Sequence, residues 1–301
     1  MVQSAFVEDA TLLAELAPAA ERLLERHLAA VRTWYPHELV PWSRGRDFEP
    51  GEQIDEASSG LPPGVRSALI VNLLTEDNLP YYLAGLVAQF GEEHPWGAWV
   101  RRWTAEEMRH ASVIRDYLAV TRCIDLRSLE QARMQHVSTA SVPRPPTAPQ
   151  ALVYVALQEL AARISHRNTG RQLDDPRGNE IMARVSADEN LHYVFYRDVV
   201  LAALQCDPSA MAIAIDAQVR HFAMPGSAIP EFGAHLRMIA ASGIYSAEIF
   251  HADVLVPVVL GHWGLEGIAG LSPDGARARD RTLRFIDRLG RIAPRLSNAT
   301  A

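Results

Sequence analysis

The sequence predicts an all-α fold, and three observations support that prediction. Apolar residues recur mostly at three- and four-residue spacing, which is the period of an amphipathic helix. Runs in which apolar and polar residues alternate, as they do in half-buried strands, are scarce. The pattern continues through all 301 residues without a clear linker. We therefore expect a single domain, 1–301, with a core large enough for several long helices.

The positions of the expected helices follow from this spacing and from the residues that begin or end helices. A first amphipathic helix is expected at 8–33, within an N-terminal segment of residues 1–35, before a loop at 36–64 that is rich in proline, glycine and aromatic residues. Pro80 predicts a kink within the helix 66–90. A connector at 136–150 leads to a helix that Gly170 closes. The remaining helices are expected at 94–121, 148–170, 179–204, 209–222, 229–251 and 276–290.

The composition excludes several classes of protein. The formal net charge of −7 disfavours a nucleic-acid-binding protein. We expect no membrane span, because the most apolar stretch is short and is broken by Pro257 and His262. The N-terminus lacks the basic and apolar segments of a secretory signal. Cys123 and Cys206 form no CxxC pair, so we expect two small buried residues in a reducing, cytoplasmic compartment.

Three Glu-x-x-His pairs are the most informative motifs. Glutamate and histidine three residues apart on a helix share one face and can bind one metal ion. A chain with 11 histidines would contain roughly one such pair by chance, so at least one of the three is expected to be accidental. We expect Glu248/His251 to be the accidental pair, because it lacks the acidic residue that precedes the glutamate in the other pairs. Those other pairs are Glu107/His110 and Glu189/His192.

Two isolated glutamates turn these pairs into a repeated pattern. Glu76 lies in an apolar stripe 31 residues before Glu107, and Glu159 lies in another stripe 30 residues before Glu189. A buried carboxylate needs a partner, which is arginine in most proteins. Four glutamates and two histidines in a twofold arrangement instead favour a di-iron or di-manganese centre in a helix bundle. We place this metal-binding bundle at 66–204 and further C-terminal helices at 205–301.

The acidic residue before each motif glutamate has a predicted role of its own. A metal-bound imidazole usually donates its second N–H to a carboxylate, which fixes the orientation of the ring. Across the bundle, Asp188 would orient His110, and Glu106 would orient His192. The alternative is that both are solvated acids on a helix surface.

Four segments resemble the soluble acyl-carrier-protein (ACP) desaturases: WTAEEMRH, LLTEDNLPYY, LQELAARISHRNTG and ADENLH. The resemblance extends from about Trp34 to Met224 and implies a ferritin-like four-helix bundle with additional flanking helices. It implies two iron ions, cycling between Fe²⁺ and Fe³⁺, with manganese as the alternative metal. The metal ligands, which would form the catalytic centre, are then Glu76, Glu107, His110, Glu159, Glu189 and His192.

The same resemblance implies the partners. These are an acyl chain on ACP, dioxygen, a ferredoxin-type electron donor and a second copy of the chain in a homodimer. The segment VPWSRGRDF resembles the one that carries a tryptophan near the surface of these enzymes. On that basis Trp42, Asp188 and His110 would form an electron path to the iron; simple packing is the alternative for Trp42. Candidate docking residues for the acidic carrier are Arg220, Arg237 and the Arg277–Arg291 cluster.

Ala162 departs from the family pattern. Members often have threonine one turn after the glutamate that corresponds to Glu159, where its hydroxyl is thought to handle protons. We therefore hold open two further functions besides desaturation. One is a di-iron oxygenase that hydroxylates a carrier-bound or free metabolite, and the other is a non-catalytic relative that binds ACP or stabilises a partner.

Overall fold

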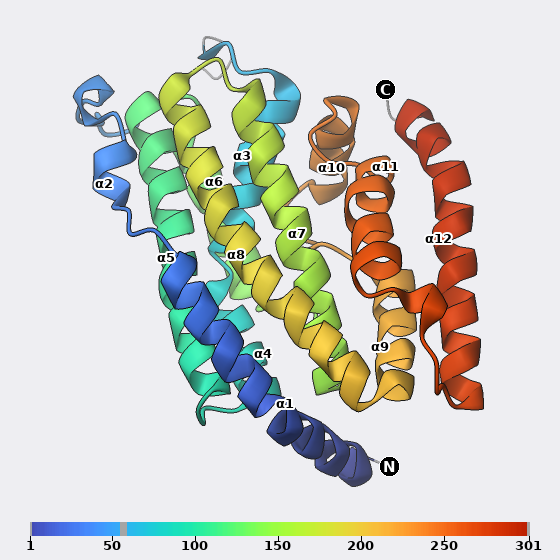
Figure 1. The fold of residues 1–301 in the computed structure, drawn as a ribbon. Helices are drawn as coiled ribbons and strands as arrows, with labels where there is room; N and C mark the ends of the chain where they lie inside the picture. Colours follow the sequence, from blue (N-terminus) through green and yellow to red (C-terminus); the bar gives the residue numbers. More distant parts are fainter. Residues whose placement is uncertain (1, 55–58, 300–301) are drawn as a thin grey trace.

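The structure, a computed structural model, describes the backbone of residues 2–54 and 59–299 and, within those ranges, the side chains of 9–293. The chain so described contains helices and no strands, as expected. Five helices make the centre of the molecule (Figure 1): α3 (Pro63–Glu76), α4 (Leu79–Phe90), α5 (Trp96–Thr121), α7 (Ala148–Gln172) and α8 (Pro176–Cys206). None of the described helices is both long and apolar enough to cross a bilayer.

The flanking helices cover opposite sides of this centre (Figure 1). Helix α1 (Val2–Ala30) packs along α8 on one side, and α2 (Pro36–Leu39) and a short turn, η1 (Trp42–Arg44), follow it. Helices α9 (Pro208–His221) and α12 (Pro273–Ala299) pack together on the other side. Between them and α7 lies a π-helical segment, η3 (Phe250–His262), which α11 (Ala247–Ile249) precedes.

Helices α7 and α8 form a hairpin, in which each helix begins at a side-chain cap and α7 carries a glycine at the contact. The side chain of Thr147 accepts a hydrogen bond from the backbone of Gln150, and that of Asp175 accepts one from Arg177. Gly170 lies so close to α8 that a Cβ there would be 2.7 Å from Cβ of Met182. The two backbones therefore approach closely near the C-terminal end of α7.

The expected helix 66–90 is two helices, which corrects the prediction of a kink at Pro80. Helix α3 ends at Glu76, and α4 begins at Leu79, after a break of two residues, with Pro80 in its first turn. Asp77 in the break forms an ion pair with Arg115. Asn78 is fully buried, and its Nδ2 donates a hydrogen bond to the carbonyl of Ser141 at 3.1 Å. Pro80 therefore starts a helix, where its missing N–H costs nothing.

Other predictions about the elements were also wrong in some details. Residues 126–138 form α6 (Leu126–Ser138), which Asp125 caps, so the connector before α7 is shorter than expected. The expected helix 229–251 is divided into α10 (Phe232–Ala241), a turn, α11 and the start of η3. Cys123 is buried, as predicted, whereas Cys206 is exposed. The single domain itself remains a prediction.

Two apolar cores leave a polar layer between them. One core contains Trp99 of α5, Phe195 of α8 and residues of α1, α7 and α9. The other contains Leu73 of α3, Ile114 of α5 and Ile181 of α8. On both α5 and α8 the Glu-x-x-His pair lies, along the sequence, between the residues of one core and those of the other. The bundle therefore holds the polar side chains at its middle, away from solvent.

Candidate metal centre

The six predicted ligands meet in this polar layer. Glu76 comes from the end of α3, Glu159 from α7, and the two Glu-x-x-His pairs from α5 and α8. Their ligand atoms form two overlapping groups, each within 4.8 Å, that could hold a metal ion. Glu107 and Glu189 belong to both groups and so lie where a bridge between two ions would be. The groups are Glu76, Glu107, His110 and Glu189, and Glu107, Glu159, Glu189 and His192.

Both histidines direct the same ring nitrogen into this cage of carboxylates. Nδ1 of His110 lies 3.1 Å from Oε2 of Glu107 and 3.4 Å from Oε1 of Glu189. Nδ1 of His192 lies 2.8 Å from Oε1 of Glu107 and 3.7 Å from Oε2 of Glu159. The arrangement therefore offers one nitrogen to each group.

The outer nitrogens of both rings face the acids expected from the sequence. Nε2 of His110 lies 3.5 Å from Oδ2 of Asp188, and Nε2 of His192 lies 2.9 Å from Oε2 of Glu106. Both acids are buried rather than solvated. A carboxylate at this position fixes the ring and leaves Nδ1 available as a ligand.

The electrostatics of the cage fit a multivalent cation. Burial, together with repulsion from Glu107 and Glu189, raises the pKa of Glu76 well above its ordinary value. Burial and repulsion from Glu189 raise the pKa of Glu159 in the same way. Oε1 of Glu107, Oε2 of Glu189 and Nδ1 of His192 are buried without a hydrogen-bond partner. Metal ions at this position would neutralise the acids and satisfy these atoms, so the residues present fit a dimetal centre.

The structure places a different tryptophan at Asp188 from the one expected. Trp42 is 51% exposed and donates from Nε1 to the carbonyl of His37 at 2.8 Å. The indole of Trp34 is buried, and its Nε1 donates to Oδ2 of Asp188 at 2.9 Å. The predicted contact between Trp42 and Asp188 is therefore replaced by one from Trp34. Trp34 and Trp42 lie only eight residues apart, so their positions in the sequence did not indicate which of them would contact Asp188.

Two further side chains, which were not predicted from the sequence, contact the predicted metal ligands. Nε2 of His166 lies 3.1 Å from Oε1 of Glu76, and burial lowers the pKa of its imidazole to about 4. Trp103 donates from Nε1 to Oε1 of Glu159 at 3.0 Å. Helical spacing could have found His166, because it lies seven residues, or two turns, after Glu159 on the same face of α7.

The third Glu-x-x-His pair lies apart from the cage. Glu248 is exposed on α11, and His251 lies on η3 against α12 at Gly290. Neither belongs to a group of potential metal ligands among the described residues. Their position agrees with the expectation that this pair is accidental.

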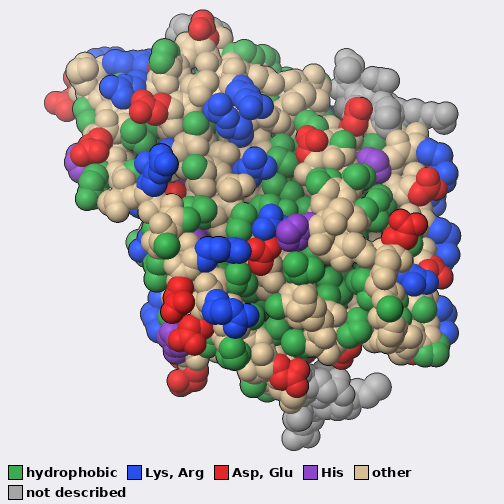
Figure 2. All heavy atoms as spheres, in the orientation of Figure 1, with side chains coloured by type: hydrophobic (Ala, Val, Ile, Leu, Met, Phe, Trp, Pro, Cys, Tyr) green, Lys and Arg blue, Asp and Glu red, His purple; other side chains and the backbone are tan. Residues whose placement is uncertain are grey.

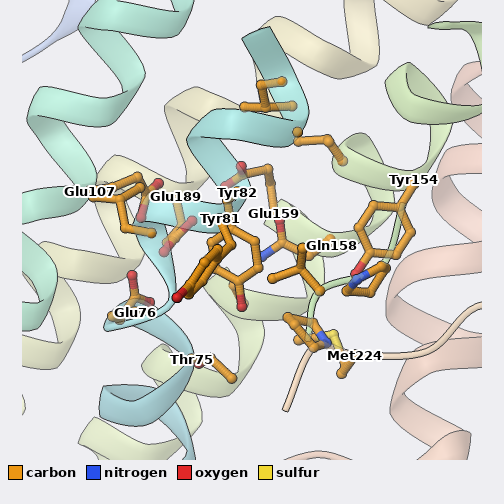
Figure 3. A pocket seen from close by; sticks show the side chains of 18 of the residues that line it. Thr75, Glu76, Tyr81, Tyr82, Glu107, Tyr154, Gln158, Glu159, Glu189 and Met224 are labelled. Carbon is orange, nitrogen blue, oxygen red and sulfur yellow. The ribbon is translucent and has the colours of Figure 1, made fainter. Parts of the chain in front are cut away.

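A cavity of about 240 Å³ opens onto the metal cage. Its walls are mainly apolar and come from α3, α4, α7, α10 and the segments around residues 143 and 224. Figure 3 shows Glu76, Glu107 and Glu189 toward one side of it, and Tyr154 and Met224 toward the other. Ala162 also lines the cavity. An apolar ligand in the cavity would therefore lie against the carboxylates.

Comparisons with known proteins agree with this geometry. Residues 8–301 match the model of a family described as fatty acid desaturase. DesA1 of Mycobacterium tuberculosis, named provisionally as an acyl-ACP desaturase, is 40% identical over 293 residues, which cover 94% of this chain and 86% of DesA1. A spinach protein named stearoyl-ACP 9-desaturase is 28% identical over 296 residues, covering 92% of this chain and 74% of that protein.

A solved structure shows the same fold. The X-ray structure of M. tuberculosis DesA2, a provisional acyl-ACP desaturase, matches with a TM-score of 0.72 and 28% identity, covering 89% of this chain and 99% of DesA2. The fold is thus the ferritin-like helical architecture expected from the sequence. The family match, the similarity to DesA1 and the shared fold lead to one conclusion: the chain belongs to the fatty acid desaturase family, among its acyl-ACP desaturases.

Proposed function

We propose that the protein introduces a cis double bond into a fatty acyl chain carried on ACP, in the course of lipid biosynthesis. The observation that carries this proposal is the opening of a mainly apolar cavity onto the cage of four glutamates and two histidines. An acyl chain is an apolar ligand, and the cavity would hold its methylenes beside the oxidising centre. Desaturation removes two hydrogens from neighbouring methylenes and needs dioxygen and two electrons.

The six predicted ligands would hold two iron ions, and Glu107 and Glu189 belong to both groups of ligands. Carboxylate and imidazole ligands suit iron, and manganese is the alternative that the same ligands accept. Iron that cycles between Fe²⁺ and Fe³⁺ supplies the chemistry with dioxygen that carboxylates alone cannot perform. The chain's own residues exclude water, hold the substrate and position the ligands.

An electron path from a ferredoxin-type donor would pass through Trp34, Asp188 and His110. These groups form a series of close contacts that ends at the cage. The guanidinium of Arg109 lies 4.8 Å from the ring centroid of Trp34, and that of Arg184 lies 6.0 Å from it. Arg109 also pairs with Asp188, so the positive charge that would favour an acidic donor near Trp34 is that of Arg184.

The carrier would dock at the mouth of the cavity. Arg144 is exposed in the cavity wall, and Arg237 follows Leu236, another wall residue. Two other predicted docking residues are less suitable, because Arg220 and Arg281 both pair with Asp216. Along α12, basic and acidic side chains are interspersed (Figure 2), and several pair within the helix. We therefore favour Arg144 and Arg237; the homodimer and the cytoplasmic location stay predictions.

A hydroxylase is the second candidate, because Ala162 leaves the cavity wall without a hydroxyl one turn from Glu159. A non-catalytic carrier-binding protein would require that the cage have no redox role, and nothing in its geometry favours that.

Mass spectrometry of the acyl chain distinguishes these functions. Iron-loaded protein would be incubated with ferredoxin, its reductase, NADPH, oxygen and acyl-ACPs of several chain lengths. Desaturation predicts a product lighter by two hydrogens, and the Glu107→Gln variant, which loses a carboxylate shared by the two groups of ligands, should produce none. A product that gains oxygen would select the hydroxylase. An unchanged chain in every acyl-ACP, with iron shown to be bound, would contradict catalysis.

A further inference from the structure

His27 is a buried histidine that the proposed mechanism does not use. It lies on α1, is 4% exposed, and places Nε2 2.9 Å from Oε2 of Glu106. Its ring meets the edge of Trp99 at a centroid distance of 5.0 Å and stacks on His192 at 5.8 Å. A histidine this deep in the bundle, at the carboxylate behind a predicted metal ligand, calls for a physical explanation.

Its position matches that of Trp34 on the other half of the centre. Asp188, behind His110, contacts the indole N–H of Trp34 and the guanidinium of Arg109. Glu106, behind His192, contacts the imidazole of His27 and the guanidinium of Arg102. Asp188 and Glu106 are thus each contacted by one ring nitrogen from the N-terminal segment and by one arginine of α5. His27 and Trp34 are seven residues apart in the chain.

The contacts of Glu106 show what His27 contributes. Oε2 of Glu106 lies 2.9 Å from Nε2 of His27 and 2.9 Å from Nε2 of His192. The other oxygen, Oε1, contacts Arg102, whose side chain is 37% exposed. Without His27, Arg102 would be the one hydrogen-bond partner, among the described residues, that remains on the side of the carboxylate away from His192. Arginine is long and flexible, so the direction of Oε2 toward His192 would no longer be fixed.

We propose that His27 is a positioning residue for the metal ion at His192. It holds Glu106 in line with Nε2 of His192, and this fixes the ring so that Nδ1 faces the cage. The proposal rests on the dimetal centre described under the proposed function. The three side chains His27, Glu106 and His192 could also hold an ion themselves. The guanidinium of Arg102 against the same carboxylate makes that use unfavourable, because it repels a cation.

Metal titration of His27→Phe tests the proposal without reference to turnover. Phenylalanine keeps a ring against Trp99 but cannot donate a hydrogen bond. Apoprotein would be titrated with Fe²⁺ under anaerobic conditions and, separately, with Co²⁺, whose absorption reports the ligands. Wild type should bind two ions per chain. His27→Phe should bind one ion unchanged and the other about 10- to 100-fold more weakly, which is the usual cost of losing an outer partner of a metal ligand.

Two further variants separate the hydrogen bond from folding. His27→Gln should recover most of the affinity, because its amide can donate from near the position of imidazole Nε2, whereas the shorter amide of His27→Asn cannot. This pair replaces His27→Phe if the latter does not fold. Arg26→Ala is the matched control: it removes the contact of α1 with Asp198, at 2.6 Å on α8, and leaves His27 intact. It should bind both ions as wild type does.

Several results would overturn the inference. In His27→Phe, these are unchanged binding of both ions or an equal loss of affinity for both. Among the other variants, they are equal affinities in His27→Gln and His27→Asn, or a loss of affinity in Arg26→Ala as large as that in His27→Phe. In wild type, the contradicting result is the binding of a third ion. Failure of the underlying proposal gives a different result, since wild type itself would then bind fewer than two ions.

Discussion

At the scale of single residues, Asp175 connects three segments of the chain. Its side chain is 16% exposed and accepts hydrogen bonds from Arg44 at 2.7 Å and from the hydroxyl of Tyr117 at 2.9 Å. It also caps α8 at the backbone N–H of Arg177. Burial alone would raise the pKa of Asp175, but these hydrogen bonds outweigh it and hold the pKa below its ordinary value of 3.8.

A lowered pKa in the folded state makes stability depend on pH in one direction. The charged carboxylate contributes its full stabilisation above its pKa in the unfolded chain, and loses it as the pH falls through the lower folded pKa. Asp175→Asn keeps a capping side chain but removes the charge. We expect it to lower the free energy of unfolding at pH 7 by about 1 kcal/mol, a modest value because the partner Arg44 is half exposed.

Urea denaturation between pH 3 and pH 7 checks this prediction. The difference between wild type and Asp175→Asn should be full above about pH 5 and should shrink below the pKa of 3.8. The exposed neighbour Asp174 provides the control, and Asp174→Asn should have little effect at any pH. A difference that stays constant down to pH 3 would show that the charge of Asp175 is not responsible.

The sequence predicted some residues of the site and missed others for physical reasons. Glu107 and His110 were predictable because helical spacing alone places both side chains on one face. Trp34 was not, because its contact with Asp188 joins segments 154 residues apart. His27 was missed for the same reason: its partner Glu106 lies 79 residues away, and nothing in the local sequence marks the contact.

At the scale of elements, the close approach of α7 and α8 depends on Gly170. A methyl group there would meet Cβ of Met182 at 2.7 Å, and neither atom can move without moving a helix. Gly170→Ala should therefore destabilise the fold by about 1 to 2 kcal/mol, because overpacking outweighs the better helix propensity of alanine. At Gly85, inside α4, nothing lies within 4 Å of an added Cβ. Gly85→Ala should stabilise by up to about 1 kcal/mol.

Thermal and urea unfolding of the two variants check this contrast. The substitution is the same in both, so the sign of the change reports the space around each glycine. If Gly170→Ala were as stabilising as Gly85→Ala, the helices would not be in close contact at this point.

The helices themselves were predictable to differing degrees. Long helices such as α5 and α8 were expected because an apolar stripe runs through them. The break between α3 and α4 was not, because it depends on a tertiary contact: buried Asn78 holds the carbonyl of Ser141. Helix α6 was missed because only Leu129 and His136 within it are buried, which leaves little apolar periodicity.

At the scale of the whole molecule, the two apolar cores enclose a layer of charge. Glu107, Glu189 and both histidines of the cage are almost fully buried, in positions where an unpaired charge is costly. The approximate twofold arrangement divides these groups into two half-sites that share Glu107 and Glu189. The N-terminal segment completes both halves from outside, through Trp34 and His27. We therefore expect two metal ions in this layer.

Anomalous diffraction at the iron edge, from crystals of the iron-loaded protein, tests that claim most directly. We predict two peaks per chain between His110 and His192, with Glu107 and Glu189 between the peaks. A single peak, or none at this position in protein that has bound iron, would contradict it.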